Sequence, residues 1–447
     1  MDKSLTLKMI ESYQQNCETD SKLKLSRNAA TQNEITDLAM DWDQFRKIDH
    51  SFSNTISGEM KITNQKSSGR CWGFAGLNLF RIYLGRKHNI RNFEFSQTYF
   101  MFWDKLEKSN YFLNSIIETA ESSSDSRIIM HLLESPIQDG GQWDMWVNLI
   151  NKYGVVPKSE MPETYQSSQS MRMNRMITRK LREFAKELRY SIKNNINNED
   201  LYELKNQMIS TVYKMLVIHL GEPPNNFNWQ TRDKKKNFMR FEGLTPQSFF
   251  KDHVSIDLSN LICLINCPMS DKKYKDIYSV KYLGNVIEGQ PIRYLNAEIE
   301  ILKKAAIESI KNDDPVWFGC DVGKYLHRSH GVMDTNLFDF DLFYGTSFSL
   351  DKASRLEYGE SKMTHAMLFT GVDIDSKGVP QKWRVENSWG DRNGEKGFYI
   401  MSDEWFDEYL YEIVVNKKYL QDEYVKLYEE KEAKLLPPWD PMGALAK

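Results

Sequence analysis

Four residue types that cooperate in acyl transfer occur along this chain of 447 residues, in the order Gln, Cys, His and Asn. Gln65 shortly precedes Cys71, and Trp72 follows the cysteine directly. His365 and Asn387 lie far downstream. A thiol nucleophile, an imidazole base, an amide that orients the base and an amide that donates to an oxyanion are the parts of one kind of site. The chemistry they indicate is acyl transfer at a carbonyl carbon.

We expect the thiol of Cys71 at the start of a helix. The apolar residues after it recur at helical spacing, and they are Trp72, Ala75, Leu79, Ile82 and Tyr83. A helix N-terminus and a neighbouring imidazolium stabilise a thiolate and lower a cysteine pKa to roughly 3.5–7.5. His365 is the candidate partner because it enters the apolar run at Ala366, which predicts a strand start at a cleft edge. His327 and His330, in a polar loop, are the competing bases.

Two amides complete the predicted site. Asn387 would accept a hydrogen bond from the other ring nitrogen of His365, and Trp389 would shield that bond from water. Gln65 would donate its side-chain amide to the oxyanion together with the Cys71 backbone N–H, each donor contributing roughly 3 kcal/mol. Taken alone, the stretch around Asn387 is compatible with an ordinary turn and Gln65 with a loop residue. Their combination with Cys71 is what indicates catalysis.

The remaining cysteines are interpreted as free thiols, and they are Cys17, Cys263, Cys267 and Cys320. An odd total of five suits a reducing compartment better than a disulfide framework. The spacing of Cys263 and Cys267 fits neither a redox pair nor a zinc site, so buried packing is the preferred interpretation there. The sequence contains no nucleotide-binding loop and no array of metal ligands, so no cofactor and no metal are implied.

The composition is that of a globular protein without a general affinity for polyanions. A hydrophobic content of 40% is ample for sizeable cores, and 447 residues allow two or three domains. The formal net charge of −3 provides no overall attraction to nucleic acid or anionic lipid. The N-terminus lacks a secretory signal pattern and no apolar run approaches a membrane span, so a cytoplasmic location is expected. The one sharp basic cluster, 233–236, is interpreted as a solvated loop.

The elements that position these residues follow from local patterns. Residues 1 to about 60 are polar with short helical patterns and form an arm. Further helices are predicted over 93–150, and apolar periodicity predicts a long helical hairpin over 171–219. Beyond about residue 250 short β-type runs predict a sheet, and 403–434 again has a helical pattern. Three prolines exclude helix from the tail, 435–447, whose apolar content predicts that it docks on something.

At these residues the chain resembles the papain-like cysteine peptidases, and within them the bleomycin hydrolase and aminopeptidase C branch. Arg70 before the cysteine separates this branch from secreted papains, which have a small residue there. The shared segments run nearly end to end and are 65–72, 138–144, 153–158, 358–361, 363–367, 385–390 and 438–446. Papain-type chains place the histidine about 130 to 150 residues after the cysteine, whereas here the separation is about 290. Inserted material is therefore expected, chiefly the predicted hairpin.

The resemblance implies an α+β, papain-like fold in which a helical domain faces a β-barrel domain across the active-site cleft. The implied divisions are an N-terminal arm (1–60), the helical domain (61–165), a helical insertion used in oligomerisation (166–250), the β-barrel domain (251–415) and a C-terminal helix with an active-site tail (416–447). Members of the branch are cytoplasmic aminopeptidases, typically homohexamers. A homohexamer that acts on peptides with a free N-terminus is therefore expected.

The resemblance also assigns roles residue by residue. The implied catalytic residues are Cys71 as nucleophile, His365 as general base and later acid, Asn387 as the orienting residue and Gln65 as the oxyanion donor. The implied substrate-binding residues are Gly140 and Gly141 as a backbone rail, Ala366 in the side-chain pocket, and Trp389, Ala446 and Lys447. Side activities on bleomycin and on homocysteine thiolactone are implied as well.

The C-terminal tail gains a role from the resemblance. In the family this arm lies in the cleft, where its terminal carboxylate pairs with the free α-amino group of a substrate and its bulk excludes longer chains. An endopeptidase cleft thereby becomes an aminopeptidase. The family can lose a final residue by self-processing, so either Ala446 or Lys447 supplies the carboxylate here.

Two other classes of function stay open at this point. The first is a nucleic-acid-binding oligomer with secondary peptidase activity, which would bind through the lysines of 234–236 and show salt-dependent affinity. The second is a Cys-His acyltransferase on a related scaffold. Product analysis with amine acceptors separates such a transferase from a hydrolase.

Overall fold

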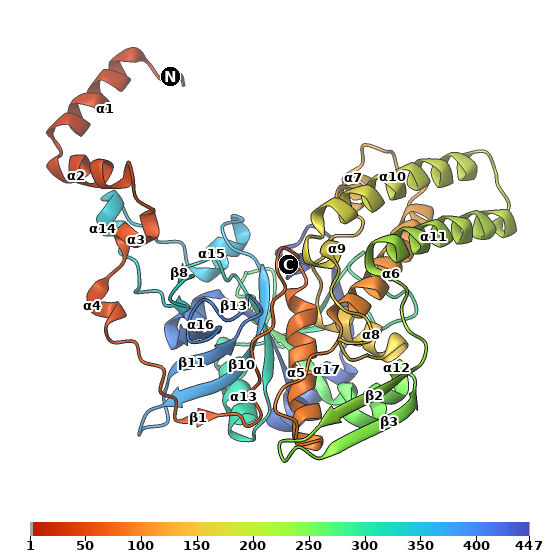
Figure 1. The fold of residues 1–447 in the computed structure, drawn as a ribbon. Helices are drawn as coiled ribbons and strands as arrows, with labels where there is room; N and C mark the ends of the chain where they lie inside the picture. Colours follow the sequence, from red (N-terminus) through yellow and green to blue (C-terminus); the bar gives the residue numbers. More distant parts are fainter. Residues whose placement is uncertain (1–2, 447) are drawn as a thin grey trace.

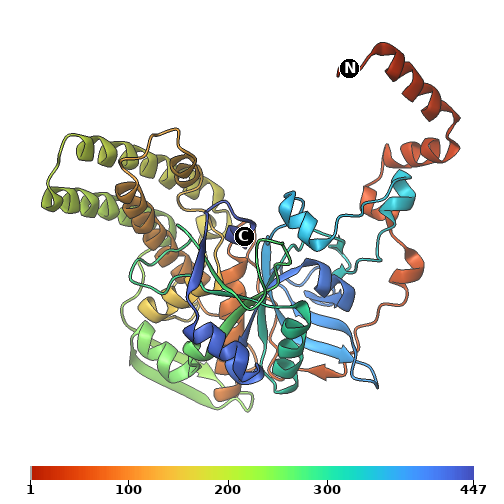
Figure 2. The same cartoon turned by 180° about the vertical axis from the view of Figure 1, so that it is seen from behind.

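The computed structural model describes residues 3–446 as two parts that face each other (Figure 1). Helices predominate in one part and strands in the other, and helix α5 (Cys71–Lys87) lies between them. Such a segregation of helices from a mixed sheet is typical of α+β proteins. The end of the described chain returns to the boundary between the two parts in both views (Figures 1 and 2).

The helical part is organised around α5. This helix starts at Cys71, as its apolar spacing predicts, and is buried on nearly all sides. The other helices of this part are α6 (Gln97–Glu118), α7 (Arg127–Glu134), α8 (Trp143–Tyr153), α9 (Tyr165–Ser168) and α12 (Pro246–Phe249), followed by a π-helical turn, η1 (Phe250–Val254). The helices predicted over 93–150 are thereby confirmed.

The long hairpin predicted over 171–219 is confirmed as α10 (Met171–Lys193) and α11 (Asn198–Leu220). The buried residues of α10 recur at helical spacing, and they are Met173, Ile177, Leu181, Phe184, Ala185 and Leu188. Both helices pack on α6, and their far ends project from the body (Figures 1 and 2). Asn197 caps α11 by accepting a hydrogen bond from the backbone N–H of Asp200 at 2.9 Å.

The segment predicted as a helical insertion, 166–250, also contains two strands that the sequence did not predict. Strands β2 (Phe227–Arg232) and β3 (Phe238–Leu244) form a separate two-stranded ribbon. Alternate side chains at the start of β2 are buried, which is the two-residue period of a strand. The basic run 233–236 is the turn of this ribbon, and the side chain of Asp233 accepts hydrogen bonds from backbone N–H groups within it.

The second part is one 12-stranded sheet, which confirms the prediction of a mostly β second half. The spatial order is β14, β5, β6, β4, β13, β7, β10, β11, β12, β9 and β8, with β1 beside β10. The strands are β1 (Asn54–Thr55), β4 (Leu261–Ile265), β5 (Ile277–Val280), β6 (Tyr294–Asn296), β7 (Val316–Cys320), β8 (Leu326–His327), β9 (Val332–Met333), β10 (His365–Ile374), β11 (Pro380–Glu386), β12 (Phe398–Ser402), β13 (Leu410–Asn416) and β14 (Ala433–Leu436). The accompanying helices are η2 (Leu258–Asn260), α13 (Ile299–Lys311), α14 (Phe340–Tyr344), α15 (Lys352–Glu357), α16 (Asp403–Tyr409), η3 (Lys417–Tyr419), α17 (Asp422–Glu430) and η4 (Pro441–Gly443).

Strand β10 connects the sheet to the predicted site. It pairs antiparallel with β7 on one side and with β11 on the other, and α5 packs against it. Its first eight residues are all buried, as expected for a central strand covered on both faces. His365 begins β10, and Asn387 directly follows the end of the neighbouring antiparallel strand β11. Two adjacent strand ends therefore carry the predicted base and its orienting amide.

The prediction of one helical stretch over 403–434 is wrong in its middle and at its end. Helices α16 and α17 flank strand β13, and β14 follows them. Strand β13 lies between β4 and β7 and is buried in all but its last residue, and its apolar, β-branched sequence favours a strand. The charged helical pattern belongs to the flanking α16 and α17. In the tail the prolines exclude an α-helix, but a single 3-10 turn, η4, begins at Pro441.

The N-terminal residues form helices α1 (Leu7–Thr19), α2 (Ser21–Ala30), α3 (Ile35–Ala39) and α4 (Trp42–Phe45). Helices α1 and α2 have no buried residue, and they extend away from the body in both views (Figures 1 and 2). Their exposed apolar side chains include Leu7, Met9 and Leu25. Among residues 3–446 no helix is long and apolar enough to cross a membrane.

Candidate active site

Cys71 is the first residue of α5, and its side chain is buried. The preceding Arg70 forms a buried ion pair with Glu163 at 2.9 Å, which fixes the turn that leads into the helix. Burial raises the pKa of the Cys71 thiol to about 12, although the backbone N–H groups of Ala366 and Trp72 bond the sulfur and oppose this shift. Burial of the thiol therefore opposes the lowering of its pKa that the sequence predicts from the helix N-terminus.

His365 and Asn387 meet as predicted. The Nε2 atom of His365 lies 2.9 Å from the Oδ1 atom of Asn387, which also accepts a hydrogen bond from the backbone N–H of Ser388. The ring of Trp389 lies over the imidazole at 4.8 Å between centroids and covers this pair. Because Nε2 donates to Asn387, the assigned tautomer leaves Nδ1 of His365 unprotonated.

The imidazole of His365 is buried, and burial favours its neutral form. Burial lowers its pKa to about 4, and the nearby Arg328 guanidinium acts in the same direction, whereas the Asn387 hydrogen bond opposes both. The ring is therefore neutral at physiological pH. The predicted base thus lies at the start of β10 and the predicted nucleophile at the start of α5, which packs against β10.

Gln65 is hydrogen-bonded both to the loop before Cys71, at Ser68, and to the loop after Asn387, at Ser388. Its backbone N–H donates to the carbonyl of Ser388 at 2.8 Å, and its side-chain Oε1 accepts from the Ser388 hydroxyl at 2.6 Å. Its Nε2 donates to the carbonyl of Ser68 at 2.6 Å, which uses one of the two N–H groups of that amide. Ser388 thus aligns Gln65 while its neighbour Asn387 aligns the imidazole. Sequence reasoning missed Ser388, although it directly follows Asn387.

The glycine pair lies against the chain's own C-terminal tail. The backbone N–H of Gly141 donates to the carbonyl of Ala446 at 3.1 Å, and the two residues form an antiparallel bridge. A Cβ atom on Gly141 would lie 2.5 Å from the ring of Trp72, so only glycine permits this close approach. The amide Nε2 of Gln142 donates to the carbonyl of Ala444. The tail therefore occupies the rail formed by Gly140 and Gly141.

Two buried lysines of α6 donate hydrogen bonds to backbone carbonyls at the glycine pair and shortly before it. Lys105 donates to the carbonyl of Ile137 at 2.6 Å. Lys108 donates to the carbonyl of Gly140 at 2.7 Å and forms an ion pair with Asp104 at 2.8 Å. Neither lysine was predicted. The sequence did contain a pattern that could have revealed their burial. Both lysines lie on the same helical stripe as apolar residues, since the positions recur every three or four residues: Met101, Lys105, Lys108 and Phe112.

Asp139 joins the rail to the nucleophile loop and to the inserted hairpin. Its carboxylate forms an ion pair with Lys105 at 2.6 Å and accepts from the backbone N–H of Gly69 at 3.0 Å. It also accepts from Asn174 on α10 at 2.6 Å, and its carbonyl accepts from the indole N–H of Trp72 at 2.7 Å. Sequence reasoning noticed only the glycines that follow Asp139 and missed this carboxylate.

The remaining predicted residues have clear positions. Ala366 is fully buried beside the Cys71 sulfur, whereas Lys447 lies outside the described residues. His327, one of the two competing bases, contacts Asp37 of the N-terminal segment at 3.3 Å, and its ring packs on that of His330. These two histidines therefore lie beside the N-terminal arm.

The five cysteines are free, and Cys17 alone is exposed. The buried Cys263 thiol donates to Glu412 at 2.9 Å, away from the site.

The fold together with the thiol, imidazole and amide arrangement defines the papain-like class of cysteine peptidases. A family model described as the peptidase C1-like family matches residues 4–443. Aminopeptidase C of Listeria monocytogenes is 45% identical over 426 residues, 95% of this chain and 93% of that protein. Bleomycin hydrolase of Homo sapiens is 42% identical over 441 residues, covering 97% of each chain. The crystal structure of PepW from Lactobacillus rhamnosis HN001 matches with a TM-score of 0.98 at 43% identity over 100% of both chains.

The chain therefore belongs to the peptidase C1-like family. It is a cysteine aminopeptidase of the aminopeptidase C and bleomycin hydrolase type. The resemblance inferred from the sequence and the predicted papain-like fold are both confirmed.

Proposed function

We propose that this aminopeptidase releases N-terminal residues through a thioester on Cys71. His365 Nδ1 takes the thiol proton, and the sulfur attacks the first carbonyl carbon of the bound peptide. The oxyanion accepts hydrogen bonds from Gln65 Nε2 and from the Cys71 backbone N–H. The proton on His365 then passes to the leaving amine as the C–N bond breaks, which leaves the acyl group on sulfur.

Hydrolysis of the thioester completes the cycle. His365 removes a proton from water, and the resulting hydroxide attacks the acyl carbon in the same oxyanion site. The C–S bond breaks, the sulfur regains a proton from His365, and the amino acid leaves with a free carboxylate. Asn387 keeps the imidazole in one orientation through both halves of the cycle.

We propose further that the tail restricts cleavage to free N-termini. The bridge between Gly141 and Ala446 carries this proposal, because a tail on the rail would exclude the part of a longer substrate that precedes its first residue. A terminal carboxylate near the rail would pair with the substrate's α-amino group. Self-removal of Lys447 would make Ala446 the terminal residue. Bleomycin and homocysteine thiolactone, which carry a free amino group near an acyl carbon, are proposed side substrates.

The experiment is product analysis by mass spectrometry on one peptide in a free and an N-acetylated form. The full-length enzyme is expected to shorten only the free peptide, one residue at a time. A variant that lacks residues 442–447 is expected to cleave the acetylated peptide at internal bonds. Identical product patterns from the two enzymes would contradict the role of the tail. The intact mass of the full-length protein reports in the same experiment whether Lys447 is removed.

We propose a cytoplasmic homohexamer as the working form. Helices α1 and α2 support this proposal because they have no buried residue and carry exposed apolar side chains, which a second copy would cover. The five free cysteines suit a reducing compartment. Sedimentation analysis tests the assembly: the full chain is expected as one hexameric species, and removal of α1 and α2 is expected to reduce its mass. A monomeric full-length chain would contradict the proposal.

A further inference from the structure

The tail must reverse direction to reach the rail. It leaves the sheet at Leu436, the last residue of β14, which pairs in parallel with β5. Ala446 nevertheless lies on Gly141 in the helical part. Two consecutive turns accomplish the reversal. In the first, the backbone N–H of Asp440 donates to the carbonyl of Pro437 at 3.0 Å, and in the second the N–H of Gly443 donates to the carbonyl of Asp440 at 2.8 Å.

Asp440 is the residue that joins these two turns. Besides its two backbone bonds, its carboxylate oxygen Oδ1 accepts from the backbone N–H of Met442 at 2.9 Å, which caps η4. Its other oxygen, Oδ2, lies 2.9 Å from the Nζ atom of Lys272. Every polar group of Asp440 therefore has a partner that defines the path of the tail.

The partner lysine belongs to the body of the enzyme. Lys272 lies in the loop between β4 and β5, and its side chain is 0% exposed, while that of Asp440 is 8% exposed. Among the described residues this is the only salt bridge made by 437–446. A buried ion pair resists screening and has strict geometry, so it fixes the position of Asp440 more firmly than an exposed pair would.

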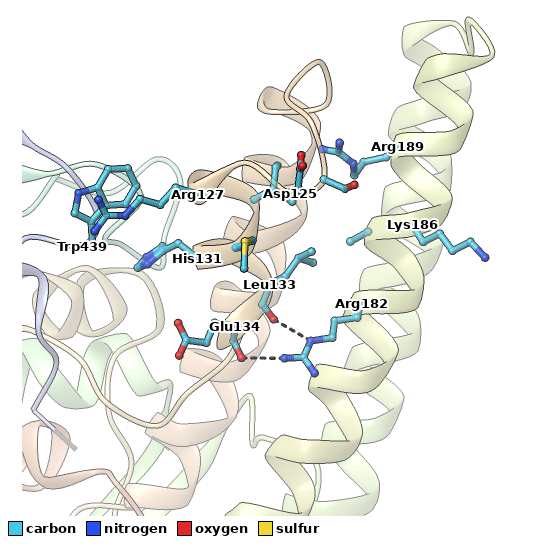
Figure 3. A pocket seen from close by; sticks show the side chains of 13 residues that line it. Asp125, Arg127, His131, Leu133, Glu134, Arg182, Lys186, Arg189 and Trp439 are labelled. Atoms are coloured by element: carbon cyan, nitrogen blue, oxygen red, sulfur yellow. Dashed lines mark hydrogen bonds between the residues drawn. The ribbon is translucent and has the colours of Figure 1, made fainter. Parts of the chain in front are cut away.

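The neighbouring Trp439 makes a second contact between the tail and the body of the enzyme, and its side chain is more exposed than that of Asp440. Its indole lies against the guanidinium of Arg127 on α7, 3.9 Å from the ring centroid. Figure 3 shows this pair at the edge of a cavity of about 1060 Å³ between α7 and α10, and Trp439 is 41% exposed there. The cavity leaves part of the indole uncovered. Of these two contacts that hold the tail, the ion pair at Asp440 is therefore the more buried.

We propose that the ion pair between Lys272 and Asp440 is a specificity-determining anchor, which sets how far the tail reaches along the rail. Asp440 and Lys272 act as positioning residues, since neither touches the reacting atoms. The proposal rests on the proposed role of the tail. It adds that the position of Ala446 is set at Asp440, six residues earlier, by its ion pair with a lysine of the β4–β5 loop. Without that ion pair the tail loses its fixed position on Gly141, and longer or blocked substrates gain access.

The test uses the full-length enzyme with the single substitutions Asp440→Asn and Lys272→Met. Asparagine preserves the size of the side chain and its acceptor for Met442, so Asp440→Asn removes chiefly the charge. The control is Glu423→Gln, which breaks the exposed pair between Glu423 and Lys275 on the same side of the enzyme, 2.7 Å long and without contact to the tail. The rate of cleavage is measured on one peptide in its free and its N-acetylated form.

Both anchor variants are expected to raise the ratio of blocked to free cleavage by about tenfold or more, with KM for the free peptide rising and kcat nearly unchanged. Glu423→Gln is expected to keep the wild-type ratio. Hydrogen exchange of the 437–446 peptide is expected to accelerate in both anchor variants while exchange of α17 stays constant. This measurement applies even to a variant with reduced activity. Wild-type exchange and a wild-type ratio in either variant would overturn the proposal.

The truncated enzyme that lacks 442–447 separates this proposal from the one on which it rests. If truncation opens the cleft to blocked peptides but Asp440→Asn does not, the tail restricts cleavage and the anchor has been wrongly assigned. If truncation has no effect, the role of the tail itself is wrong.

Discussion

Arg81 on α5 and Glu386 at the end of β11 form an ion pair 2.6 Å long, with side chains 1% and 0% exposed. Arg81 belongs to the helix that begins with Cys71, and Glu386 directly precedes Asn387. The pair therefore links the element that carries the nucleophile to the one that carries the orienting amide. Burial raises the pKa of Glu386, while the Arg81 guanidinium opposes that shift.

Replacing Arg81 by methionine is expected to lower the free energy of unfolding by about 3–5 kcal/mol, because it leaves the Glu386 carboxylate buried without its partner. Chemical denaturation of the variant and the wild type measures the difference. The double variant Arg81→Met with Glu386→Gln removes both charges and is expected to recover most of the loss. A single variant as stable as the wild type would contradict this account of the pair.

The oxyanion role of Gln65 predicts a loss in kcat. Gln65→Ala removes one donor, and kcat is expected to fall by about 10²–10³-fold with a smaller change in KM. Ser388→Ala keeps the donor but removes the hydroxyl that aligns it, so a smaller fall is expected. Steady-state kinetics on an aminoacyl amide provide both numbers. Equal effects of the two substitutions would show that Gln65 acts only as a structural residue.

The buried Lys108 predicts an effect on substrate affinity. Its bond to the Gly140 carbonyl shapes the rail, so its loss is expected to raise KM for peptides by about tenfold while kcat changes little. The informative variant is Asp104→Asn with Lys108→Met, since it leaves no unpaired charge behind. The single variant Asp104→Asn keeps the bond to the rail and serves as the control. A selective loss of kcat in the double variant would argue against a role in binding.

The buried carboxyl of Glu412 predicts a decline in stability with rising pH. Burial raises its pKa to about 8, the Cys263 thiol lowers it by hydrogen bonding, and the nearby Asp144 raises it. Because this folded-state pKa exceeds the unfolded value near 4.3, the folded chain holds a proton that the unfolded chain releases. The contribution is complete below about pH 4 and is lost as pH rises to about 8, at up to about 1.4 kcal/mol per pH unit.

The variant Glu412→Gln isolates this contribution. Glutamine preserves the shape of the side chain but cannot titrate, so the difference in unfolding free energy between wild type and variant is expected to change by this slope between about pH 5 and about pH 8. Denaturation midpoints measured across that interval test it. A constant difference at every pH would show that Glu412 does not bind the extra proton.

Local patterns in the sequence were sufficient for the helix at Cys71, the hairpin over 171–219 and the strand at His365, because each depends on a short apolar period. The contact of His365 with Asn387 was also predicted, from the combination of a thiol, an imidazole and an amide in that chain order. Strand β13 was missed because the charged helices α16 and α17 flank it and obscure its short apolar, β-branched run, in which Glu412 is the one charged residue. The ribbon of β2 and β3 was missed as well.

The supporting polar contacts of the site could not be predicted for a different reason. Ser388, Asp139 and Lys108 act through hydrogen bonds to backbone groups and to residues far away in the sequence. Ser388 and Asp139 leave no periodic signal, and although Lys108 falls on an apolar helical stripe, a buried lysine is unusual enough that a solvated position is the natural expectation. The burial of the Cys71 thiol was likewise missed, because Ala366, whose backbone N–H bonds the sulfur, lies far away in the sequence.

The central claim is that Cys71 carries the chemistry, and the most direct measurement compares hydrolysis of an aminoacyl amide by Cys71→Ala and by Cys17→Ala. Cys17 lies exposed on α1, far from the site, so its replacement controls for the general loss of a thiol. The account predicts that Cys71→Ala loses activity by about 10⁴-fold or more while its thermal unfolding stays cooperative. Cys17→Ala should match the wild type. Substantial hydrolysis by a folded Cys71→Ala enzyme would contradict the account.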